Sequence, residues 1–167
     1  MEKEYYILWY RLENRDAYLI WYSDETDGVL TDSSGKIISF DTKERLLEYA
    51  LKVKIDIKSE ILELHNIDIV SEWIKANDPE KINFTEFNNI WNLWTDIANS
   101  INSSFYQDSY TIDKIYDKLF WSCDLPTAAA EDNRYFPEWT EDELAAMKEL
   151  FSNGINMFQQ SLVSLGN

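Results

Sequence analysis

Near its start the chain reads YYILWYRLENRDAYLIWY (residues 5–22). Two runs rich in aromatic and apolar side chains, residues 5–10 and 17–22, flank the polar turn Glu13-Asn14-Arg15-Asp16. Such runs separated by a short polar turn are typical of a β-hairpin, because aromatic and branched side chains pack well on a pleated surface. The sequence therefore predicts that the fold begins with an antiparallel hairpin.

A second, shorter hairpin is predicted next. Residues 28–31 and 36–40 are largely apolar, and they flank Asp32-Ser33-Ser34-Gly35. A type I turn favours Asp at its first position and Gly at its last, as here. These residues extend the predicted sheet by two strands.

A helix and a further strand follow this hairpin in the predicted order. Asp41 is expected to cap the helix, with Glu44 three residues later completing a capping-box pattern. Residues 54–57 indicate a short strand, which we expect to lie parallel to the strand ending at Phe40, because strand, helix and strand in this order form a crossover. The helix carries its apolar side chains on one stripe: Leu46, Leu47, Ala50 and Leu51.

After about residue 59 the hydrophobic pattern changes to a period of 3.6, which predicts helices. Asp68 is expected to cap a short helix that ends near residues 77–79. The clearest helical pattern covers residues 84–101, with this apolar stripe: Phe84, Phe87, Ile90, Trp91, Trp94, Ile97, Ala98 and Ile101. Because its tryptophans lie on the inward stripe, we expect them to pack in the core rather than to stack on a ligand.

Two more helices are predicted in the C-terminal part of the chain. One has the apolar stripe Ile112, Ile115, Tyr116, Leu119 and Phe120. The other begins at a capping box made by Thr140 and Glu143, and its stripe holds Leu144, Met147, Phe151, Ile155, Phe158 and Leu162. The whole sequence predicts one α+β domain over residues 1–167, with a small antiparallel or mixed sheet and one helix in residues 1–58 and about four helices in residues 59–167.

The charge of the chain is strongly negative and unevenly distributed. Its 31 acidic and 15 basic residues give a formal net charge of −16, of which residues 1–58 carry −3 and residues 59–167 carry −13. No cluster of Lys and Arg is available to neutralise phosphates, so we expect no nucleic-acid partner and no anionic membrane surface. An acidic surface instead accelerates association with basic proteins through long-range steering. We expect a basic protein partner; the alternative is that the charge only confers solubility.

Composition also predicts where the chain works. It contains no run of about eighteen consecutive apolar residues, and its start, Met1-Glu2-Lys3-Glu4, lacks the basic and apolar regions of a secretory signal. A single cysteine excludes intramolecular disulfides and zinc sites with several cysteines. We therefore expect a cytoplasmic protein.

Familiar catalytic and metal-binding patterns are absent from the sequence. His65 is the sole histidine and Cys123 the sole cysteine, so neither a two-histidine relay nor a histidine metal cluster is available. There is no glycine-rich phosphate loop, GxSxG elbow or HExxH motif. We expect no cofactor, no metal and no catalytic residue. The alternative is an enzyme with two carboxylates about 5–10 Å apart, and a deep cleft lined by two acids in different environments would favour it.

Two acidic segments are the candidate binding sites. Residues 123–143 carry seven acids and one base, and they place Tyr135, Phe136 and Trp139 among the acids. Aromatic anchors surrounded by charge are typical of protein-binding hot spots. Alternatively, this is a solvated loop whose residues 141–143 complement the dipole of the last helix. Together with the loop at residues 24–27, the predicted binding residues are Asp24, Glu25, Asp27, Asp124, Glu131, Asp132, Tyr135, Glu138 and Trp139.

Two stretches of the chain resemble bacterial immunity proteins. The first contains Trp21-Tyr22-Ser23-Asp24, Gly28-Val29-Leu30, Gly35-Lys36 and Phe40, and it leads into Leu46-Leu47-Glu48-Tyr49-Ala50. The second contains Ile90-Trp91-Asn92-Leu93-Trp94-Thr95-Asp96-Ile97-Ala98-Asn99-Ser100, followed by Tyr116-Asp117-Lys118-Leu119-Phe120-Trp121. Both are similar to patterns in the immunity proteins of contact-dependent growth inhibition systems and related polymorphic toxins. The resemblance transfers no individual binding residue.

The resemblance implies a non-catalytic protein that binds and neutralises a cognate toxin domain delivered by a neighbouring cell. Many toxins of this class are ribonucleases, including domains that cleave transfer RNA, and they are basic because they grip RNA phosphates. An acidic inhibitor with aromatic anchors suits such a partner. The alternative is a general acidic protein-binding module or nucleic-acid mimic, which would bind several basic proteins with poor discrimination.

Overall fold

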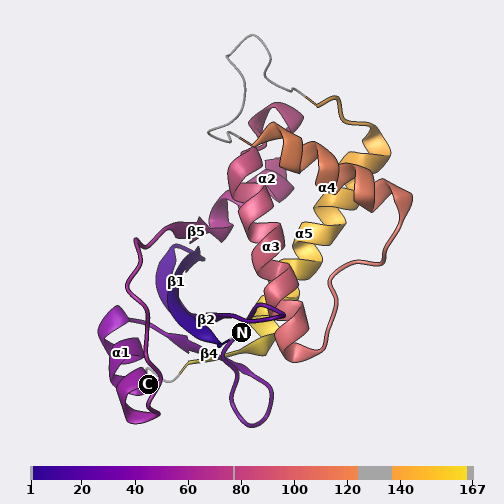
Figure 1. The fold of residues 1–167 in the computed structure, drawn as a ribbon. Coiled ribbons are helices and arrows are strands. Elements are labelled where there is room, and N and C mark those ends of the chain that lie inside the picture. Colours follow the sequence, from indigo (N-terminus) through magenta and orange to yellow (C-terminus); the bar gives the residue numbers. More distant parts are fainter. Residues whose placement is uncertain (1, 77, 124–136, 165–167) are drawn as a thin grey trace.

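The computed structural model describes residues 2–76, 78–123 and 137–164. They form a mixed sheet with a block of helices packed beside it (Figure 1), which confirms the predicted α+β class. The strands are β1 (Glu4–Leu12), β2 (Arg15–Ser23), β3 (Gly28–Val29), β4 (Ile37–Phe40), β5 (Leu64–Asn66) and β6 (Leu162–Ser164). The helices are α1 (Lys43–Lys52), α2 (Ile67–Ala76), a 3-10 turn (Pro79–Lys81), α3 (Phe84–Ile101), α4 (Tyr110–Ser122) and α5 (Glu141–Ser161).

The sheet has the strand order β5-β1-β2-β4-β6, and β3 also pairs with β2. β1 and β2 form the predicted antiparallel hairpin, in register from Glu4↔Ser23 to Leu12↔Arg15. β5 lies parallel to β1, and β6 lies parallel to β4. These two outer strands come from a part of the chain for which the sequence predicts only helices, because three residues are too few to display a strand period.

Two residues in the left-handed region make the turn of the hairpin. Glu13 and Asn14 have φ of 52° and 63°, which is the geometry of a type I′ turn and matches the twist of the two strands. Their backbone N–H groups donate to the two carboxylate oxygens of Asp68 at 2.7 and 2.8 Å. The prediction that Asp68 caps a helix is therefore wrong: its side chain binds the hairpin turn, and α2 begins one residue earlier, at Ile67.

β3 and β4 both pair with β2. They are also joined to each other by an antiparallel bridge between Thr31 and Ile37, so the predicted second hairpin is present but reduced to one bridge. The predicted turn between them is present, since the Gly35 N–H donates to the backbone oxygen of Asp32 at 3.0 Å and Gly35 has φ of 82°. The Asp32 carboxylate also accepts from the Ser34 and Lys36 N–H groups. Residues 31–36 are thus a short excursion from a strand that continues along β2.

The cap of α1 and the crossover after it differ from the prediction. The N-cap is Thr42, whose Oγ1 accepts from the Arg45 N–H at 3.2 Å, and not Asp41. The expected strand at residues 54–57 reduces to a single parallel bridge between Ile57 and Tyr5 of β1. Because β4 lies on the other side of the hairpin, the chain crosses the sheet after α1.

The apolar stripe of α1 is only half buried. Leu46 and Ala50 are buried in a small core with Ile20 and Phe40, whereas Leu47 and Leu51 are 42% and 81% exposed. The predicted apolar stripe is therefore buried only at Leu46 and Ala50, because α1 contacts the sheet along one narrow side.

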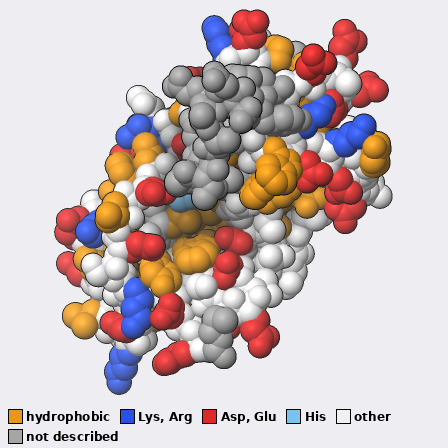
Figure 2. All heavy atoms as spheres, turned by 45° about the horizontal axis from the view of Figure 1, so that its top comes forward, with side chains coloured by type: hydrophobic (Ala, Val, Ile, Leu, Met, Phe, Trp, Pro, Cys, Tyr) orange, Lys and Arg blue, Asp and Glu red, His pale blue; other side chains and the backbone are white. Residues whose placement is uncertain are grey.

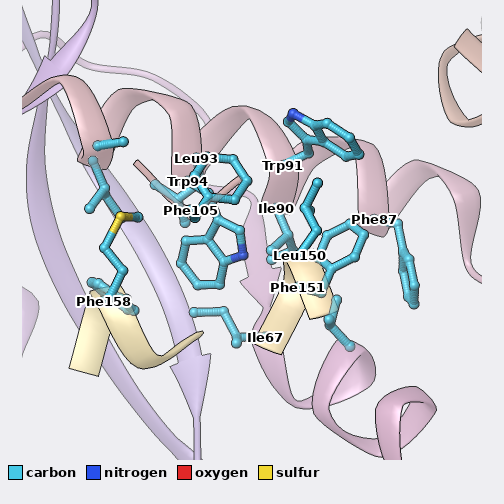
Figure 3. Packing of buried hydrophobic residues seen from close by; sticks show 14 of the residues in the cluster. Ile67, Phe87, Ile90, Trp91, Leu93, Trp94, Phe105, Leu150, Phe151 and Phe158 are labelled. Carbon is cyan, nitrogen blue, oxygen red and sulfur yellow. The ribbon is translucent and has the colours of Figure 1, made fainter. Parts of the chain in front are cut away.

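The large core lies between the helices and the sheet, and α3 supplies much of it. The helix has the predicted bounds, and the predicted inward position of its tryptophans is confirmed: Trp91 and Trp94 are 2% and 0% exposed. Their rings lie 5.9 and 5.5 Å from those of Phe151 and Phe158 of α5 (Figure 3). Aromatic packing of this kind joins the two long helices.

Helix α5 begins at the predicted capping box. The Glu143 N–H donates to Thr140 Oγ1 at 3.1 Å, and the Thr140 N–H donates to Glu143 Oε1 at 3.0 Å. At its other end, Leu162 does not continue the helical stripe, since it has φ of −80° and ψ of 137° and starts β6. In the described ranges, no helix has the length and apolar character needed to cross a membrane.

Candidate functional site

The structure describes only part of the first predicted binding segment. Glu138 is exposed, whereas Trp139 is half-buried and packs against the large core. Part of the Trp139 ring surface is therefore used within the fold, and the rest is exposed. Four of the predicted residues lie outside the described residues: Asp124, Glu131, Asp132 and Tyr135.

An ion pair organises the chain around Trp139. Lys118 Nζ lies 2.7 Å from Glu143 Oε1, donates to the backbone oxygen of Glu138 at 2.6 Å, and lies 5.5 Å from the centroid of the Trp139 ring. Burial raises the pKa of Glu143, but hydrogen bonds from Lys118 and Thr140 outweigh burial and hold this pKa below its ordinary value. These described residues of the segment serve the start of α5.

The acids of the second predicted site bind largely within their own turn. Asp24 Oδ1 accepts from the Glu25 N–H at 2.9 Å, and Asp27 Oδ1 accepts from the Asp24 N–H at 3.2 Å. Asp24 also lies 3.5 Å from Lys3 Nζ. Glu25 is exposed and Asp27 is half-buried. Of the three, Asp27 is the one whose charge reaches the groove described next.

A groove of about 480 Å³ opens between β1, α3 and the segment that leads into β5; we call it the α3 groove. Figure 2 shows hydrophobic side chains gathered in a hollow on this side of the molecule, with acidic side chains beside them. Three of the lining side chains are acidic, and the described lining contains no Lys or Arg. The polar and aromatic lining residues are Tyr6, Trp21, Glu60, Glu63, His65, Asn89, Asn92 and Asp96.

A mismatch in strand pairing creates the outer wall of the α3 groove. The neighbouring segment pairs with β1 at Tyr5↔Ile57 and again at Trp9↔Leu64. Between these points β1 advances four residues and the other segment seven. The Lys58 N–H still donates to the backbone oxygen of Tyr5, so residues 59–63 bulge away from the sheet. The bulge places exposed acids at positions 60 and 63 on the rim, and its tip, Ile61, is 89% exposed.

Asp96 lies on the inner wall of the groove and is bonded to the sheet. Its Oδ2 accepts from Trp21 Nε1 at 2.8 Å. The Trp21 ring in turn lies 5.6 Å from the ring of Tyr6, at an angle of 46°. The carboxylate is therefore held at a fixed place beside two aromatic rings.

The electrostatic environment of Asp96 is unusual for a carboxylate. Burial raises its pKa, the hydrogen bond from Trp21 lowers it, and the nearby charge of Asp27 raises it further, which brings the pKa from 3.8 to about 6. Desolvation of a charge costs free energy unless an opposite charge compensates it. Among the described residues that line the groove, no Lys or Arg compensates the charge of Asp96.

Backbone contacts fix the helix beneath this carboxylate. Ser100, one turn after Asp96, accepts from the Val29 N–H at 2.8 Å and donates to the backbone oxygen of Asp96 at 2.8 Å. Gly28 allows β3 to approach this closely, since a side chain there would collide with the hydroxyls of Ser100 and Tyr22. The inner wall is therefore rigidly tied to the sheet.

His65 closes one end of the groove. Its Nδ1 lies 3.3 Å from the backbone oxygen of Trp9. Because a carbonyl oxygen can only accept, Nδ1 carries the proton in this contact. The next residue, Asn66, donates its N–H to Glu86 Oε1 at 2.6 Å, and burial raises the pKa of that carboxyl.

A second hollow, of about 550 Å³, lies on the other side of the exposed residue Asn92, which lines both. Asn92 Oδ1 accepts from the Tyr116 hydroxyl at 3.3 Å. The ring of Trp91 lies 5.6 Å from that of Tyr106 and 5.2 Å from that of Tyr116, and the acids Asp113 and Asp117 line the same hollow. The acidic and aromatic character of the surface thus continues across α3.

The described residues contain no group of three or more His, Cys, Asp or Glu that could hold a metal ion. Cys123 Sγ lies 3.2 Å from the backbone oxygen of Leu119, its helical neighbour, and His65 contacts the backbone of Trp9. The side chains that the site does bring together are carboxylates, amides and aromatic rings, which suit the binding of a cationic group.

Sequence reasoning missed most of this site. It predicts binding residues in two acidic loops, whereas the groove uses Glu60, Glu63 and Asp96, and only Asp27 is shared through its charge. The sequence does contain one signal for this site: Asp96 is an acid on the polar side of an amphipathic helix, between the core residues Trp94 and Ile97. Its partner Trp21 is remote in sequence, and no periodicity reveals such a contact.

Comparison with known proteins gives a fold and no family. No protein-family model matches the chain, and no curated protein does. Among solved structures the chain is similar to one described as the crystal structure of SatS C-terminal domain in complex with bromine. The two share 13% sequence identity with a TM-score of 0.58, over 96% of this chain and 93% of that chain. At this identity the likeness is one of fold alone.

Proposed function

We propose that this chain is an immunity protein, which binds and neutralises a basic nuclease toxin domain through the α3 groove. The observation that carries the binding role is the groove itself, where three acidic side chains and two aromatic rings line one hollow without a Lys or Arg among the described lining residues. The immunity role and the nuclease class of the partner rest on the sequence resemblance.

The charge of the chain supports a basic partner. A net charge of −16 accelerates encounter with a cationic protein, while aromatic side chains in a desolvated hollow slow its dissociation. A ribonuclease must present cationic side chains to grip RNA phosphates, and the same side chains suit Glu60, Glu63 and Asp96. The chain would then occupy the surface that the nuclease uses for its substrate.

The experiment is a binding and rescue assay with the toxin domain encoded beside this gene. We expect tight one-to-one binding by calorimetry and restored growth of cells that express the toxin. The double variant Glu60→Lys/Glu63→Lys should weaken binding by at least tenfold at low salt. The matched control, Glu72→Lys/Glu149→Lys, changes the net charge equally at exposed positions on α2 and α5 and should have a much smaller effect.

Two results would contradict the proposal. The first is that no basic domain encoded nearby binds the chain. The second is that several unrelated basic proteins bind with similar affinity, which would favour the alternative of a general acidic module or nucleic-acid mimic.

A second candidate function is hydrolysis at a carboxylate pair. The half-buried Asp96, with its raised pKa, and the exposed Glu63 line the same groove in different environments, as acid–base catalysis requires. Incubation with a panel of nitrophenyl glycosides tests it. Turnover that disappears in Asp96→Asn would favour the enzyme, and absence of turnover by the unaltered chain would remove this candidate.

A further inference from the structure

The inner wall of the α3 groove holds the carboxylate of Asp96, of which one oxygen is hydrogen-bonded and the other is available to accept. Asp96 Oδ2 accepts from Trp21 Nε1 at 2.8 Å, whereas Oδ1 has no hydrogen-bond partner among the described residues. The bond from Trp21 fixes the carboxylate, so the second oxygen is oriented without needing a ligand. A fixed, half-desolvated acceptor of this kind is suited to a cationic donor.

Other acceptors lie on the same helical face. Asn89 and Asn92 precede Asp96 by seven and four residues, so they follow one another along the groove. The amide oxygen of Asn92 already accepts from Tyr116, which leaves Asn89 as the amide acceptor that this face adds. Glu63 adds an exposed carboxylate from the opposite rim. Several acceptors around one hollow suit a cation with several donors, and a guanidinium has five in a planar arrangement.

The remaining walls suit the rest of an arginine side chain. Tyr6 and Trp21 line the groove with aromatic rings, and a guanidinium stacks on such rings better than an ammonium does. Ile61 and Leu93 line the groove where a methylene stem could pack. An anion is disfavoured by the three acids, and the described residues lack a set of three metal ligands.

From these contacts we infer that an arginine side chain enters the α3 groove, donates to Asp96 Oδ1 and stacks against the Tyr6 and Trp21 rings. That the arginine belongs to a basic protein partner rests on the proposed function. The site then takes a single anchoring residue of that partner, in the manner of a hot spot, while the rim acids at positions 60 and 63 guide it inward.

Binding of arginine to this site should depend on pH. The charge that acts on Asp96 in the free chain is that of Asp27, and the other titratable groups of the groove lining are Glu60, Glu63 and His65. A guanidinium would favour the ionised form of Asp96, so binding should release a proton near pH 6 and weaken as the pH falls below that value. The ionised carboxylate of Asp96 is therefore the origin both of the charge contact with arginine and of the pH dependence of binding.

The test uses short capped peptides and the indole N–H signal of Trp21 in a ¹H–¹⁵N NMR spectrum. We expect acetyl-Gly-Arg-Gly-amide to shift this signal in a saturable way at millimolar concentration. The peptide with citrulline, which keeps the shape and loses the charge, should bind at least tenfold more weakly, and the lysine peptide several-fold more weakly. Equal shifts by the arginine and citrulline peptides would overturn the inference.

Variants locate the site. Asp96→Asn keeps an oxygen that can accept from Trp21 but removes the charge, and it should weaken the arginine peptide at least tenfold. Glu63→Gln, at an exposed position, should weaken it two- to threefold. Glu72→Gln on α2 makes the same change in net charge away from the groove and should have no effect. Unaltered binding by both groove variants would refute the assignment.

The outcome separates this inference from the proposed function. If the toxin domain binds and Asp96→Asn leaves its affinity unchanged, the arginine site is wrong while the immunity role stands. If the peptides behave as expected and no toxin domain binds, the immunity role fails, because the peptide titration does not involve a toxin.

Discussion

The indole of Trp94 on α3 lies against the backbone of Gly154, a buried position in the middle of α5. A side chain at position 154 would occupy the space of the indole ring, so glycine sets the separation of the two long helices. Trp94 is fully buried and also contacts Phe158 one turn further along α5. The helical block therefore depends on a residue that is unfavourable within a helix by itself.

We predict that Gly154→Ala destabilises the fold. Alanine favours a helix over glycine by about 1 kcal/mol, but overpacking against the rigid Trp94 ring costs about 1–3 kcal/mol, and more where backbone must move. A lower midpoint in urea denaturation checks this. Asn156→Ala, at an exposed position of the same helix, should instead leave the midpoint unchanged or raise it slightly. A stabilised Gly154→Ala variant would show that α3 and α5 move apart at little cost to make room for the added methyl group.

Trp91→Ala should lower the free energy of unfolding by about 3–5 kcal/mol, as truncation of a large buried aromatic side chain does. The Trp91 ring is 2% exposed and contacts rings from three segments, among them Phe151 and Tyr116. Trp121→Ala is the control, because that side chain is 64% exposed and its loss should change stability by about 0.5 kcal/mol or less. If Trp91→Ala unfolds at the same urea concentration as the unaltered chain, the tryptophan does not act as a core residue.

The burial of Trp91 and Trp94 is an example of a feature that the sequence could predict. α3 is recognisable because its apolar residues repeat every three or four positions over eighteen residues, and the capping box of Thr140 and Glu143 is a local pattern. Such features depend only on neighbours in the sequence. Strand β6 contradicts the helical stripe at Leu162, since it forms only because β4 lies beside it.

The α3 groove could not be predicted for the same reason. It depends on the contact of Trp21 with Asp96, which are 75 residues apart. It depends also on the unequal lengths of chain between two pairings with β1, which push Glu60 and Glu63 to the rim. Composition reveals that acids and aromatics are abundant, but their meeting place follows from tertiary structure.

Removal of Lys118 should destabilise the start of α5. Glu143 is 4% exposed, and Lys118 supplies the cation that compensates its charge. We expect Lys118→Met to cost about 3–5 kcal/mol near neutral pH, because a buried carboxylate is left without its partner. Stability curves in urea at several pH values check this, and Lys148→Met on an exposed part of α5 is the control.

The cost of Lys118→Met should disappear in acid. The pKa of Glu143 lies below its ordinary value of 4.5 in the folded chain, so the ion pair stabilises the fold fully above about pH 4.5 and loses this contribution as the pH falls through the lower folded value. A difference between the two chains that stays constant from neutral pH into strong acid would mean that the charge of Glu143 is not what Lys118 stabilises.

The opposite dependence is expected at Asp96, whose pKa is raised from 3.8 to about 6. Between these values the folded chain holds this proton more tightly than the unfolded chain, so the free energy of unfolding should fall as the pH rises from about 4 to 6. Asp96→Asn removes the desolvated charge and keeps an acceptor for Trp21. We therefore expect the variant to be more stable than the unaltered chain at pH 7, by about 1–3 kcal/mol, with the difference vanishing below about pH 4. Glu72→Gln should show no such pH dependence.

An Asp96→Asn variant that gains stability while losing affinity for the arginine peptide would show the trade-off typical of a binding site, where a destabilising charge is kept for its ligand. An Asp96→Asn variant that loses stability at pH 7 would instead make Asp96 a structural residue of the sheet–helix contact.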